Sequence, residues 1–424
     1  MLSSVASVSL MKIVTQALVV VTSIVIARFF GIEVVGTYAF FMTLLSILVL
    51  VSSVGTDNVI IQAVARANTG SIRYRNRVLS SSLVIRLVFL LFSFLIIFIY
   101  MNYFSKIHIE KEVQIVLFFS ALLLSVLGGY SSFLLGSGNP LLSTFIFEFL
   151  QSFCRILMVI LLALFVSPEH FNSLAFGNFL VLLFIAIVFQ VALFKKFCFK
   201  IVRSNVRVVF LLLKRGFPLF LSSSSWMVML YTDIVFLSTF SNVETVGGYS
   251  VGQKLSAGMA IFLSSVNAVF GKRFAENFRQ RNTMGIERDL HVSTAVLFAL
   301  SSISLIIVAF FSSEIMGLWG KDFERFGVIF LILIIGQFFN TATGSVGLLL
   351  IMGGKRLLVA KITATSAVLN IVLNLVLVPA FGGTGAAIAT AISLIVLNML
   401  FVFYVRKDFG VYPLSFNMSL LKGT

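Results

Sequence analysis

Six charged side chains lie within long apolar stretches of the chain, where a charge can bind a partner or carry an ion. They are Lys12, Arg86, Glu148, Arg155, Asp233 and Lys254. A charge at the centre of a bilayer costs roughly 3 kcal/mol on insertion scales. Each of the six is therefore expected to face an opposite charge or a water-filled cavity, and we take them as the candidate functional groups.

Two pairs of these residues lie at matching depths in the predicted helices. Arg86 and Glu148 are each about eight residues from the cytoplasmic ends of their helices, counted at the α-helical rise. Asp233 and Lys254 are each about ten residues from a shared external turn near Asn242. Equal depth permits two ion pairs, which would either fix helix packing or mark a transport path. Asp233 is also a candidate carrier of a coupling proton.

Arg155 and Lys12 have no obvious single partner in the sequence, so we expect both to contact substrate. Glu148, Gln151, Ser152 and Arg155 recur at helical spacing and predict one polar face on their helix. Arginine suits bidentate contact with phosphate, and lysine supplies a point charge. Together with Arg86 and Lys254, these side chains would offer an anion cations at successive depths.

Two amides lie one turn apart in a later apolar stretch. Asn370 and Asn374 fall on one helix face together with Ser366. Amides commonly join helices inside membrane bundles by hydrogen bonding. We therefore expect Asn370 and Asn374 to hold helices together rather than to bind substrate.

The composition places most of this chain in lipid. Of its 424 residues, 59% are hydrophobic and only 11% charged, with a mean hydropathy of +1.11. The net charge of +16 comes from basic residues clustered in short loops, which is typical of topology signals facing anionic lipid and not of a nucleic-acid-binding face. Membrane lipids, and no nucleic acid, are the expected surroundings.

About twelve apolar runs are long enough to cross a bilayer, because roughly 20 helical residues span its hydrocarbon core. The runs are continuously apolar rather than alternating, which predicts helices. Basic residues gather in alternate loops, so both termini are expected in the cytoplasm.

The most basic segment divides the chain. Residues 195–216 carry seven cations and no acidic residue: Lys195, Lys196, Lys200, Arg203, Arg207, Lys214 and Arg215. Six apolar runs lie on each side, so we expect a six-helix lobe at 1–194, a cytoplasmic linker at 195–216 and a second six-helix lobe at 217–424.

A short repeat supports two related halves. Glu33-x-Val35-Gly36-x-Tyr38 recurs as a second copy about half the chain length later, where it reads Glu244-x-Val246-Gly247-x-Tyr249. Each copy follows the first apolar run of its half. Six spans per half leave the two halves entering the membrane in the same direction, so they are expected to be parallel repeats.

The sequence offers nothing for catalysis or a bound cofactor. It has no cluster of His, Asp or Glu at ligand spacing, no P-loop and no nucleophile motif. No loop exceeds about 20 residues, too short for a catalytic domain. We therefore expect no catalytic residue, no metal and no cofactor. The remaining classes are a secondary transporter and, less favoured, a channel.

Three motifs resemble a known family. The stretch at 27–38 reads ARFFGIEVVGTY, that at 213–218 reads LKRGFP and that at 378–387 reads VPAFGGTGAA. They are similar to the A-R-x-x-G-x-x-x-x-G-x-Y signature, the start of the seventh span and the P-x-x-G-x-x-G-A-A turn of polysaccharide exporters. Asp233 also stands where these exporters often have an acidic residue. The resemblance is to Wzx-type O-antigen flippases of the multidrug, oligosaccharidyl-lipid and polysaccharide exporter superfamily.

This resemblance implies a fold, a substrate and a place. The fold is all-α, a polytopic membrane protein of about twelve transmembrane helices in two parallel six-helix lobes around a central cationic cavity. The substrate would be an O-antigen or related repeat unit on undecaprenyl pyrophosphate, moved across the bacterial cytoplasmic (inner) membrane. Candidate partners are a polysaccharide polymerase and a chain-length regulator.

The expected function is thus a lipid-linked oligosaccharide flippase working by alternating access with ion coupling, not an enzyme. Two alternatives stay open. A multidrug or cation antiporter of the same superfamily would favour acidic groups within the spans, and here basic groups outnumber acidic ones. A membrane glycosyltransferase or polymerase would need a polar catalytic region, for which no loop is long enough.

Overall fold

The chain is helical throughout the residues that its computed structural model describes, which are 2–66, 72–165, 171–197, 202 and 204–413. Within those ranges there is no β-strand. The chain divides into two compact units, Met1–Ser224 and Ser225–Thr424, which we call unit 1 and unit 2.

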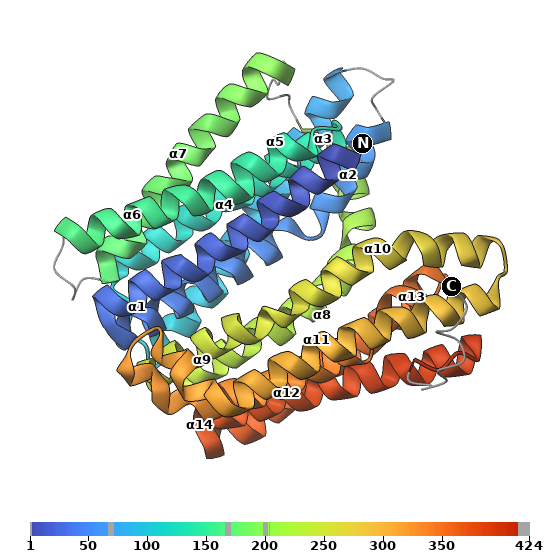
Figure 1. Cartoon of the computed structure of the whole chain (residues 1–424). Coiled ribbons are helices and arrows are strands. Elements are labelled where there is room, and N and C mark those ends of the chain that lie inside the picture. Colours follow the sequence, from blue (N-terminus) through green and yellow to red (C-terminus); the bar gives the residue numbers. More distant parts are fainter. Residues whose placement is uncertain (1, 67–71, 166–170, 198–201, 203, 414–424) are drawn as a thin grey trace. The chain divides into compact units, whose positions relative to one another are not determined.

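Unit 1 is built from long spans and short connecting helices (Figure 1). The helices are α1 (Leu2–Ser53), α2 (Thr56–Arg66), α3 (Ile72–Tyr103), α4 (Lys111–Gly136), α5 (Pro140–Thr144), η2 (Phe145–Leu150), α6 (Gln151–Phe165), α7 (Phe171–Phe197) and the first part of α8 (Val206–Phe240). Of these, α5, η2 and α6 form one continuous span, within which η2 is π-helical.

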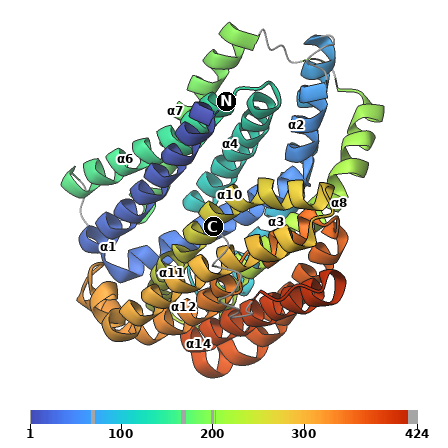
Figure 2. The same cartoon turned by 45° about the vertical axis from the view of Figure 1, so that its right-hand side comes forward.

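Unit 2 contains the rest of α8 and its own set of helices (Figure 2). They are α9 (Val243–Ala257), α10 (Met259–Arg279), α11 (Thr283–Gly317), η3 (Lys321–Phe326), α12 (Gly327–Ala342), α13 (Val346–Met352) and α14 (Arg356–Phe409). Within unit 2, α11, α12 and α14 lie side by side in both views.

Two helices are each long enough for two spans. Helix α1 leaves helical geometry at Gly31 (φ 81°, ψ 175°), and α14 does so at Gly382 (φ 55°, ψ −130°). Positive φ favours glycine because it lacks a Cβ. Each helix therefore consists of two limbs that meet at a glycine, and Figure 1 shows α1 turning back.

The described residues contain nine helices that are apolar and long enough to cross a membrane, or ten when the bent α8 is included. Counting the two limbs of α1 and of α14 separately raises ten to the twelve spans predicted. The prediction of an all-α, multi-pass membrane protein is confirmed.

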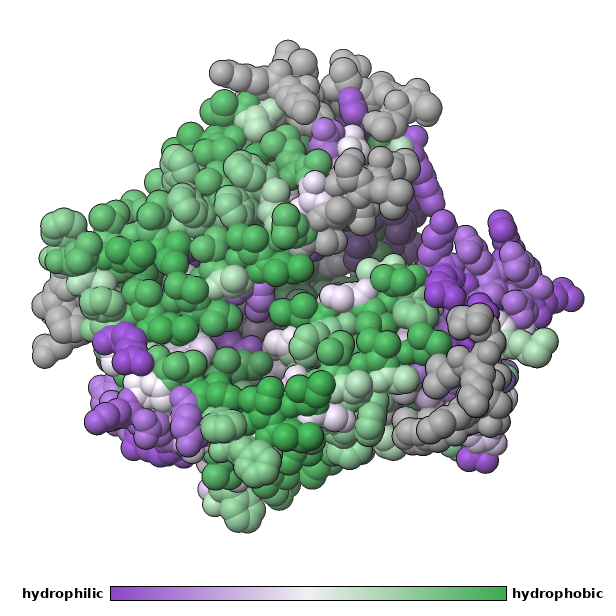
Figure 3. Space-filling view, in the orientation of Figure 1, coloured by the Kyte–Doolittle hydropathy of each residue, from purple (hydrophilic) through white to green (hydrophobic). Residues whose placement is uncertain are grey.

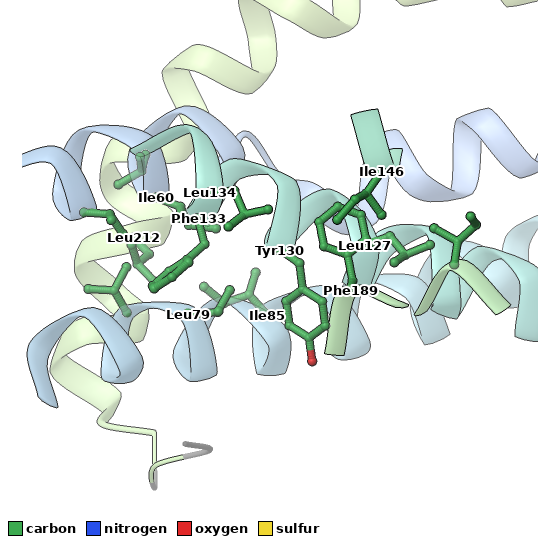
Figure 4. Packing of buried hydrophobic residues seen from close by; sticks show 14 of the residues in the cluster. Ile60, Leu79, Ile85, Leu127, Tyr130, Phe133, Leu134, Ile146, Phe189 and Leu212 are labelled. Carbon is green, nitrogen blue, oxygen red and sulfur yellow. The ribbon is translucent and has the colours of Figure 1, made fainter. Parts of the chain in front are cut away.

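The apolar side chains are distributed as a membrane protein requires. Figure 3 shows hydrophobic side chains along the sides of the helices and hydrophilic ones at their ends. Within unit 1, a buried core joins α2, α3, α4, α7 and α8, where Ile60, Leu79, Phe133, Phe189 and Leu212 meet (Figure 4). This packing fixes the helices that carry the polar groups described below.

Much of the basic segment at 195–216, which was predicted as a linker, is helical. Helix α7 continues to Phe197 and α8 begins at Val206, so Arg207, Lys214 and Arg215 stand on α8. Lys200 and Arg203 lie outside the described residues. The helices thus extend beyond the apolar runs from which the linker was predicted.

Candidate functional site

Among the described residues of unit 1, Arg86 is the most deeply buried cation, and its partner differs from the one expected. Its side chain is 2% exposed. It forms an ion pair with Asp57, and its Nη1 donates to the Ser125 carbonyl oxygen at 2.8 Å. Ser132 Oγ also donates to Asp57 Oδ1, at 2.8 Å. The expected pairing of Arg86 with Glu148 is therefore wrong, and Arg86 is held by α2 and α4.

A sharp backbone turn between α1 and α2 positions Asp57. Between α1 and α2, Val54 and Gly55 both have positive φ, 43° and 70°. A Cβ on Gly55 would come within 2.8 Å of the Phe220 backbone nitrogen, so the backbone of α8 packs directly on this turn. Helix α2 then starts at Thr56, and Asp57 in its first turn faces the positive end of the helix dipole.

The other candidate charges of unit 1, those of Lys12, Glu148 and Arg155, are carried by α1 and by the η2–α6 span. Lys12 Nζ lies 3.6 Å from Glu148 Oε1, and the two side chains are 57% and 36% exposed. Lys12 therefore has the partner that the sequence did not reveal. One turn further along, the Gln151 amide accepts a hydrogen bond from Arg155 Nη2 at 3.0 Å when its nitrogen donates to the Phe147 carbonyl oxygen.

Several buried polar atoms near this face have no hydrogen-bond partner among the described residues. They are Thr15 Oγ1, Tyr38 Oη and Arg155 Nε. Tyr38 is 8% exposed, and its helix α1 packs against α6, which carries Arg155. We call Lys12, Tyr38, Glu148, Gln151 and Arg155 the unit 1 cluster. Some of its hydrogen-bonding groups have no partner in the described part of the chain and are available to a ligand.

Unit 2 buries the carboxylate of Asp233 without a cationic partner among the described ion pairs, whereas its other buried carboxylate, Asp289, pairs with Arg273. Asp233 on α8 is 0% exposed. It accepts hydrogen bonds from Tyr249 Oη, from Asn374 Nδ2 at 2.8 Å and from Thr390 Oγ1 at 2.6 Å. The expected pairing with Lys254 is wrong, because Lys254 is not among the partners of Asp233. Lys254 lies half-buried in the last turn of α9.

The two limbs of α14 meet at Asp233. Asn370 and Asn374 stand on the first limb and Thr390 on the second, and Asn370 Nδ2 donates to Thr390 Oγ1 at 3.3 Å. The predicted role of these amides in joining helices is thus confirmed. We call Asp233, Tyr249, Asn370, Asn374 and Thr390 the unit 2 cluster.

The unit 2 cluster is rich in oxygen. The Oδ1 atoms of Asn370 and Asn374 are buried and have no hydrogen-bond partner among the described residues. Hard monovalent and divalent cations prefer carboxylate, amide and hydroxyl oxygens. The chemistry of this donor set therefore fits a proton on Asp233 or a small cation beside it. No group of three or more His, Cys, Asp or Glu residues is placed to hold a metal within the described ranges, the unit 2 cluster included.

Sequence reasoning missed Asp57, Tyr249, Tyr38 and Thr390. Two of them had a signal, because Tyr38 and Tyr249 are the last residues of the two repeat copies. Asp57 follows Val54-Gly55, a break in an apolar run that ended the predicted span just before it. Thr390 had no signal of its own, since threonines are frequent in these spans.

Comparison with solved structures shows the fold. The chain is similar to a lipid II flippase MurJ in an inward closed conformation, with a TM-score of 0.78 at 16% identity over 95% of this chain and 88% of that one. It is also similar to an inward-facing multidrug resistance MATE family transporter of the MOP superfamily, with a TM-score of 0.73 at 15% identity over 96% of each chain.

A curated relative matches part of the sequence. The chain is 27% identical over 186 residues to a probable low-salt glycan biosynthesis flippase, Agl15, of Haloferax volcanii. That match covers 43% of this chain and 38% of the relative, so the chain spans well under half the relative's length.

The family model described as polysaccharide biosynthesis protein matches residues 1–270, the whole of unit 1 and the start of unit 2. Together with the fold shared with those solved structures, this match confirms the resemblance to a polysaccharide-export family. The chain belongs to the polysaccharide biosynthesis protein family.

Proposed function

We propose that this protein flips a lipid-linked oligosaccharide across the bacterial cytoplasmic membrane by alternating access. Its substrate would be an O-antigen or related polysaccharide repeat unit on undecaprenyl pyrophosphate. The observation that carries the proposal is the partly exposed pair of cationic groups, Lys12 and Arg155, on the spans of unit 1 in a chain of this family. A pyrophosphate needs such groups to cross a medium of low dielectric.

The relatives are consistent with this substrate class. A probable glycan biosynthesis flippase matches part of the sequence, and a lipid II flippase has a similar fold. Lys254 on α9 would add a cation in unit 2. Arg86 contributes less to this role than the sequence suggested, because Asp57 and Ser125 already occupy its guanidinium.

Ion coupling would run through the unit 2 cluster. Asp233 is enclosed by neutral donors and by amide oxygens without partners among the described residues, which suits a proton or a small cation that binds and leaves. Glu148 is the second candidate, since its pairing with Lys12 can open when an anion draws the lysine away.

The topology completes the proposal. Both termini would lie in the cytoplasm, because basic residues gather in the same set of alternate loops. A polysaccharide polymerase and a chain-length regulator would act on the product at the other face. The turns near Lys106 and Lys321 should then be labelled from outside after cysteine substitution, whereas labelling at Arg281 from outside would contradict this orientation.

A reconstituted assay tests flipping directly. The full chain is placed in vesicles that contain undecaprenyl-pyrophosphate-linked sugar carrying an NBD label, and dithionite quenches label in the outer leaflet. Protein should expose inner-leaflet label to quenching faster than empty vesicles do. Equal rates in both would overturn the proposal.

Variants in cells link the activity to the cationic residues. We expect Arg155→Ala and Lys254→Ala to lower surface polysaccharide while membrane abundance stays at the wild-type level, and Lys254→Arg to be milder than Lys254→Ala. Normal export by both alanine variants, or loss of export only through loss of protein, would assign these residues a structural role.

A cation antiporter is the second candidate. The MATE-like fold and the enclosed Asp233 favour it. A drug-accumulation assay separates the two functions, because an antiporter would lower the uptake of organic cations in an Asp233-dependent way and leave surface polysaccharide unchanged. A glycosyltransferase or polymerase has no comparable support, since none of the described connections forms a catalytic domain.

A further inference from the structure

The repeat gives the two units one tyrosine each at corresponding positions. Tyr38 ends the copy that begins at Glu33, and Tyr249 ends the copy that begins at Glu244. Both stand on the second span of their unit, beyond the turn that closes the first span. Both are buried, at 8% and 0% exposure. The same residue at the same place can therefore be compared in two surroundings.

In unit 2 this tyrosine donates a hydrogen bond to an acidic side chain of the protein. Tyr249 Oη donates to Asp233 Oδ2. The carboxylate stands on the first span of the unit, so the hydrogen bond joins the first two spans. A buried hydroxyl is stable only with such a partner, because leaving it unpaired costs about 1–3 kcal/mol.

In unit 1 the corresponding negative charge is missing. The spacing that relates Glu33 to Glu244 relates Thr22 to Asp233. Thr22 Oγ1 donates to the Leu18 carbonyl oxygen of its own helix at 2.7 Å. Tyr38 Oη has neither donor nor acceptor within hydrogen-bond distance among the described residues. The hydroxyl is thus buried without the oxyanion that its counterpart binds.

A cation stands near Tyr38 instead. Arg155 stands on α6, which packs against α1, the helix that carries Tyr38, and Arg155 Nε is buried without a hydrogen-bond partner within the described part of the chain. Arg155 is a donor only, whereas Asp233 in the other unit, when ionised, is an acceptor only. The tyrosine of unit 2 thus contacts an anionic side chain, whereas in unit 1 the helix packed against the tyrosine's own helix carries a cation.

We propose that Tyr38 Oη and the Arg155 guanidinium form an oxyanion subsite in unit 1, which binds a phosphate oxygen of the lipid-linked substrate. The substrate would bring to Tyr38 the negative oxygen that Asp233 supplies to Tyr249. This subsite rests on the proposed function for the identity of its ligand, but its anion chemistry does not depend on the sugar.

Binding to the purified full chain in lipid nanodiscs tests the subsite. The probes are undecaprenyl pyrophosphate, uncharged undecaprenol and inorganic pyrophosphate. Tyr38→Phe removes only the hydroxyl oxygen and should weaken binding of both pyrophosphate probes about tenfold, the size expected for a hydrogen bond to a charged group. Binding of undecaprenol should stay unchanged. Tyr103→Phe, on an exposed tyrosine at the end of α3, is the matched control and should bind all three probes as wild type does.

A second variant guards against a folding effect. Arg155→Gln should weaken binding of the same two anionic probes and spare undecaprenol, and both variants should elute from size exclusion as wild type does. Equal weakening of pyrophosphate and undecaprenol by Tyr38→Phe would make Tyr38 a packing residue and overturn the subsite.

The outcomes separate the subsite from the proposed function. Wild-type affinity of Tyr38→Phe for undecaprenyl pyrophosphate overturns the subsite and leaves the flippase proposal standing. Tyr38-dependent binding of inorganic pyrophosphate without binding of undecaprenyl pyrophosphate supports the subsite and overturns the proposed carrier. Failure of the wild-type protein to bind either anion overturns both.

Discussion

The unit 1 and unit 2 clusters hold their charges in opposite ways. In unit 2, Asp233 is fully buried, and side chains from α9 and from both limbs of α14 donate to it. In unit 1, Lys12 and Glu148 are long side chains that meet at 3.6 Å while still partly exposed. Unit 2 therefore buries its carboxylate, whereas unit 1 leaves its charged side chains accessible to a ligand.

This difference shows what burial alone can indicate about an intramembrane charge. A buried charge depends on partners inside its own unit, so removing one of them destabilises that unit, and such a charge can also serve a small ion. A partly exposed pair contributes little to stability, because water or lipid headgroups compete for it. Stability and transport should therefore respond differently to substitutions in the two clusters, and four sets of substitutions test this.

The largest loss of stability is expected at Arg86, which belongs to neither cluster. Arg86→Ala removes a large buried side chain together with its hydrogen bond to the Ser125 carbonyl oxygen and its ion pair with Asp57, and truncating a large buried side chain costs about 2–5 kcal/mol. The melting temperature in detergent should fall further than it does for substitutions in either cluster. Asp57→Asn is the companion variant: it leaves the buried Arg86 guanidinium without its counter-charge and should also destabilise, and the two substitutions together should cost less than the sum of the single losses. A melting temperature near that of wild type for Arg86→Ala would mean that the pair does not hold α2 and α3 together.

Tyr249→Phe should produce the next largest loss. It removes one donor from a buried carboxylate, and a hydrogen bond to a charged group contributes about 1.5–3 kcal/mol. Tyr38→Phe is the matched variant in unit 1 and should not lower the melting temperature and should even raise it, because it removes a buried hydroxyl that has no described partner. Equal destabilisation by the two variants would remove the contrast between the units.

Alanine at the glycine turns should cost about 1–3 kcal/mol, the penalty for a non-glycine residue in a sparsely populated backbone region. Gly31 lies at φ 81° with nothing within 4 Å of an added Cβ, so the cost at Gly31 comes from the backbone alone. The limb that begins there carries Tyr38, and the limb after Gly382 carries Thr390. Thermal unfolding of Gly31→Ala and Gly382→Ala should show similar losses, whereas Gly138→Ala, at a turn outside both limbs, should leave transport intact.

The smallest effect on stability is expected at Lys12. Lys12→Ala removes a partly exposed ion pair, which is worth about 0–1 kcal/mol. Flipping in vesicles should nevertheless fall, since Lys12 is one of the proposed substrate contacts. The double variant Lys12→Glu with Glu148→Lys would restore the pair with its charges exchanged. Full recovery of flipping by that variant would show that the pair matters only for packing.

Much of the fold could be predicted from the sequence because depth in a membrane is a one-dimensional property. Apolar length set the twelve spans, and the glycines at 31 and 382, both within the family-like motifs, mark the turns of α1 and α14. Pro379 stands just before the second of these turns. The charged residues of both clusters were also found, since a charge in an apolar run is conspicuous.

The pairing of those charges could not be predicted for a physical reason. Equal depth suggested Arg86 with Glu148, but contact also depends on how each helix is rotated about its own axis. That rotation is set by packing among helices, which no single apolar run reports. Asp57, the partner of Arg86, follows the backbone turn at Val54 and Gly55. The apolar run that predicted the preceding span ends at that turn, so Asp57 is not counted among the charges within the spans.

The π-helix η2 affects how this chain aligns with homologues. A π turn holds one residue more than an α turn between its hydrogen-bonded groups. Between Phe145 and Leu150 the chain therefore advances less per residue, and Glu148 faces Lys12 within this wider turn. A homologue whose corresponding span is α-helical throughout is expected to align with a one-residue gap between Pro140 and Gln151. In such a homologue an acidic residue copied at the aligned position would be rotated away from the lysine, so sequence identity there would not imply the same ion pair.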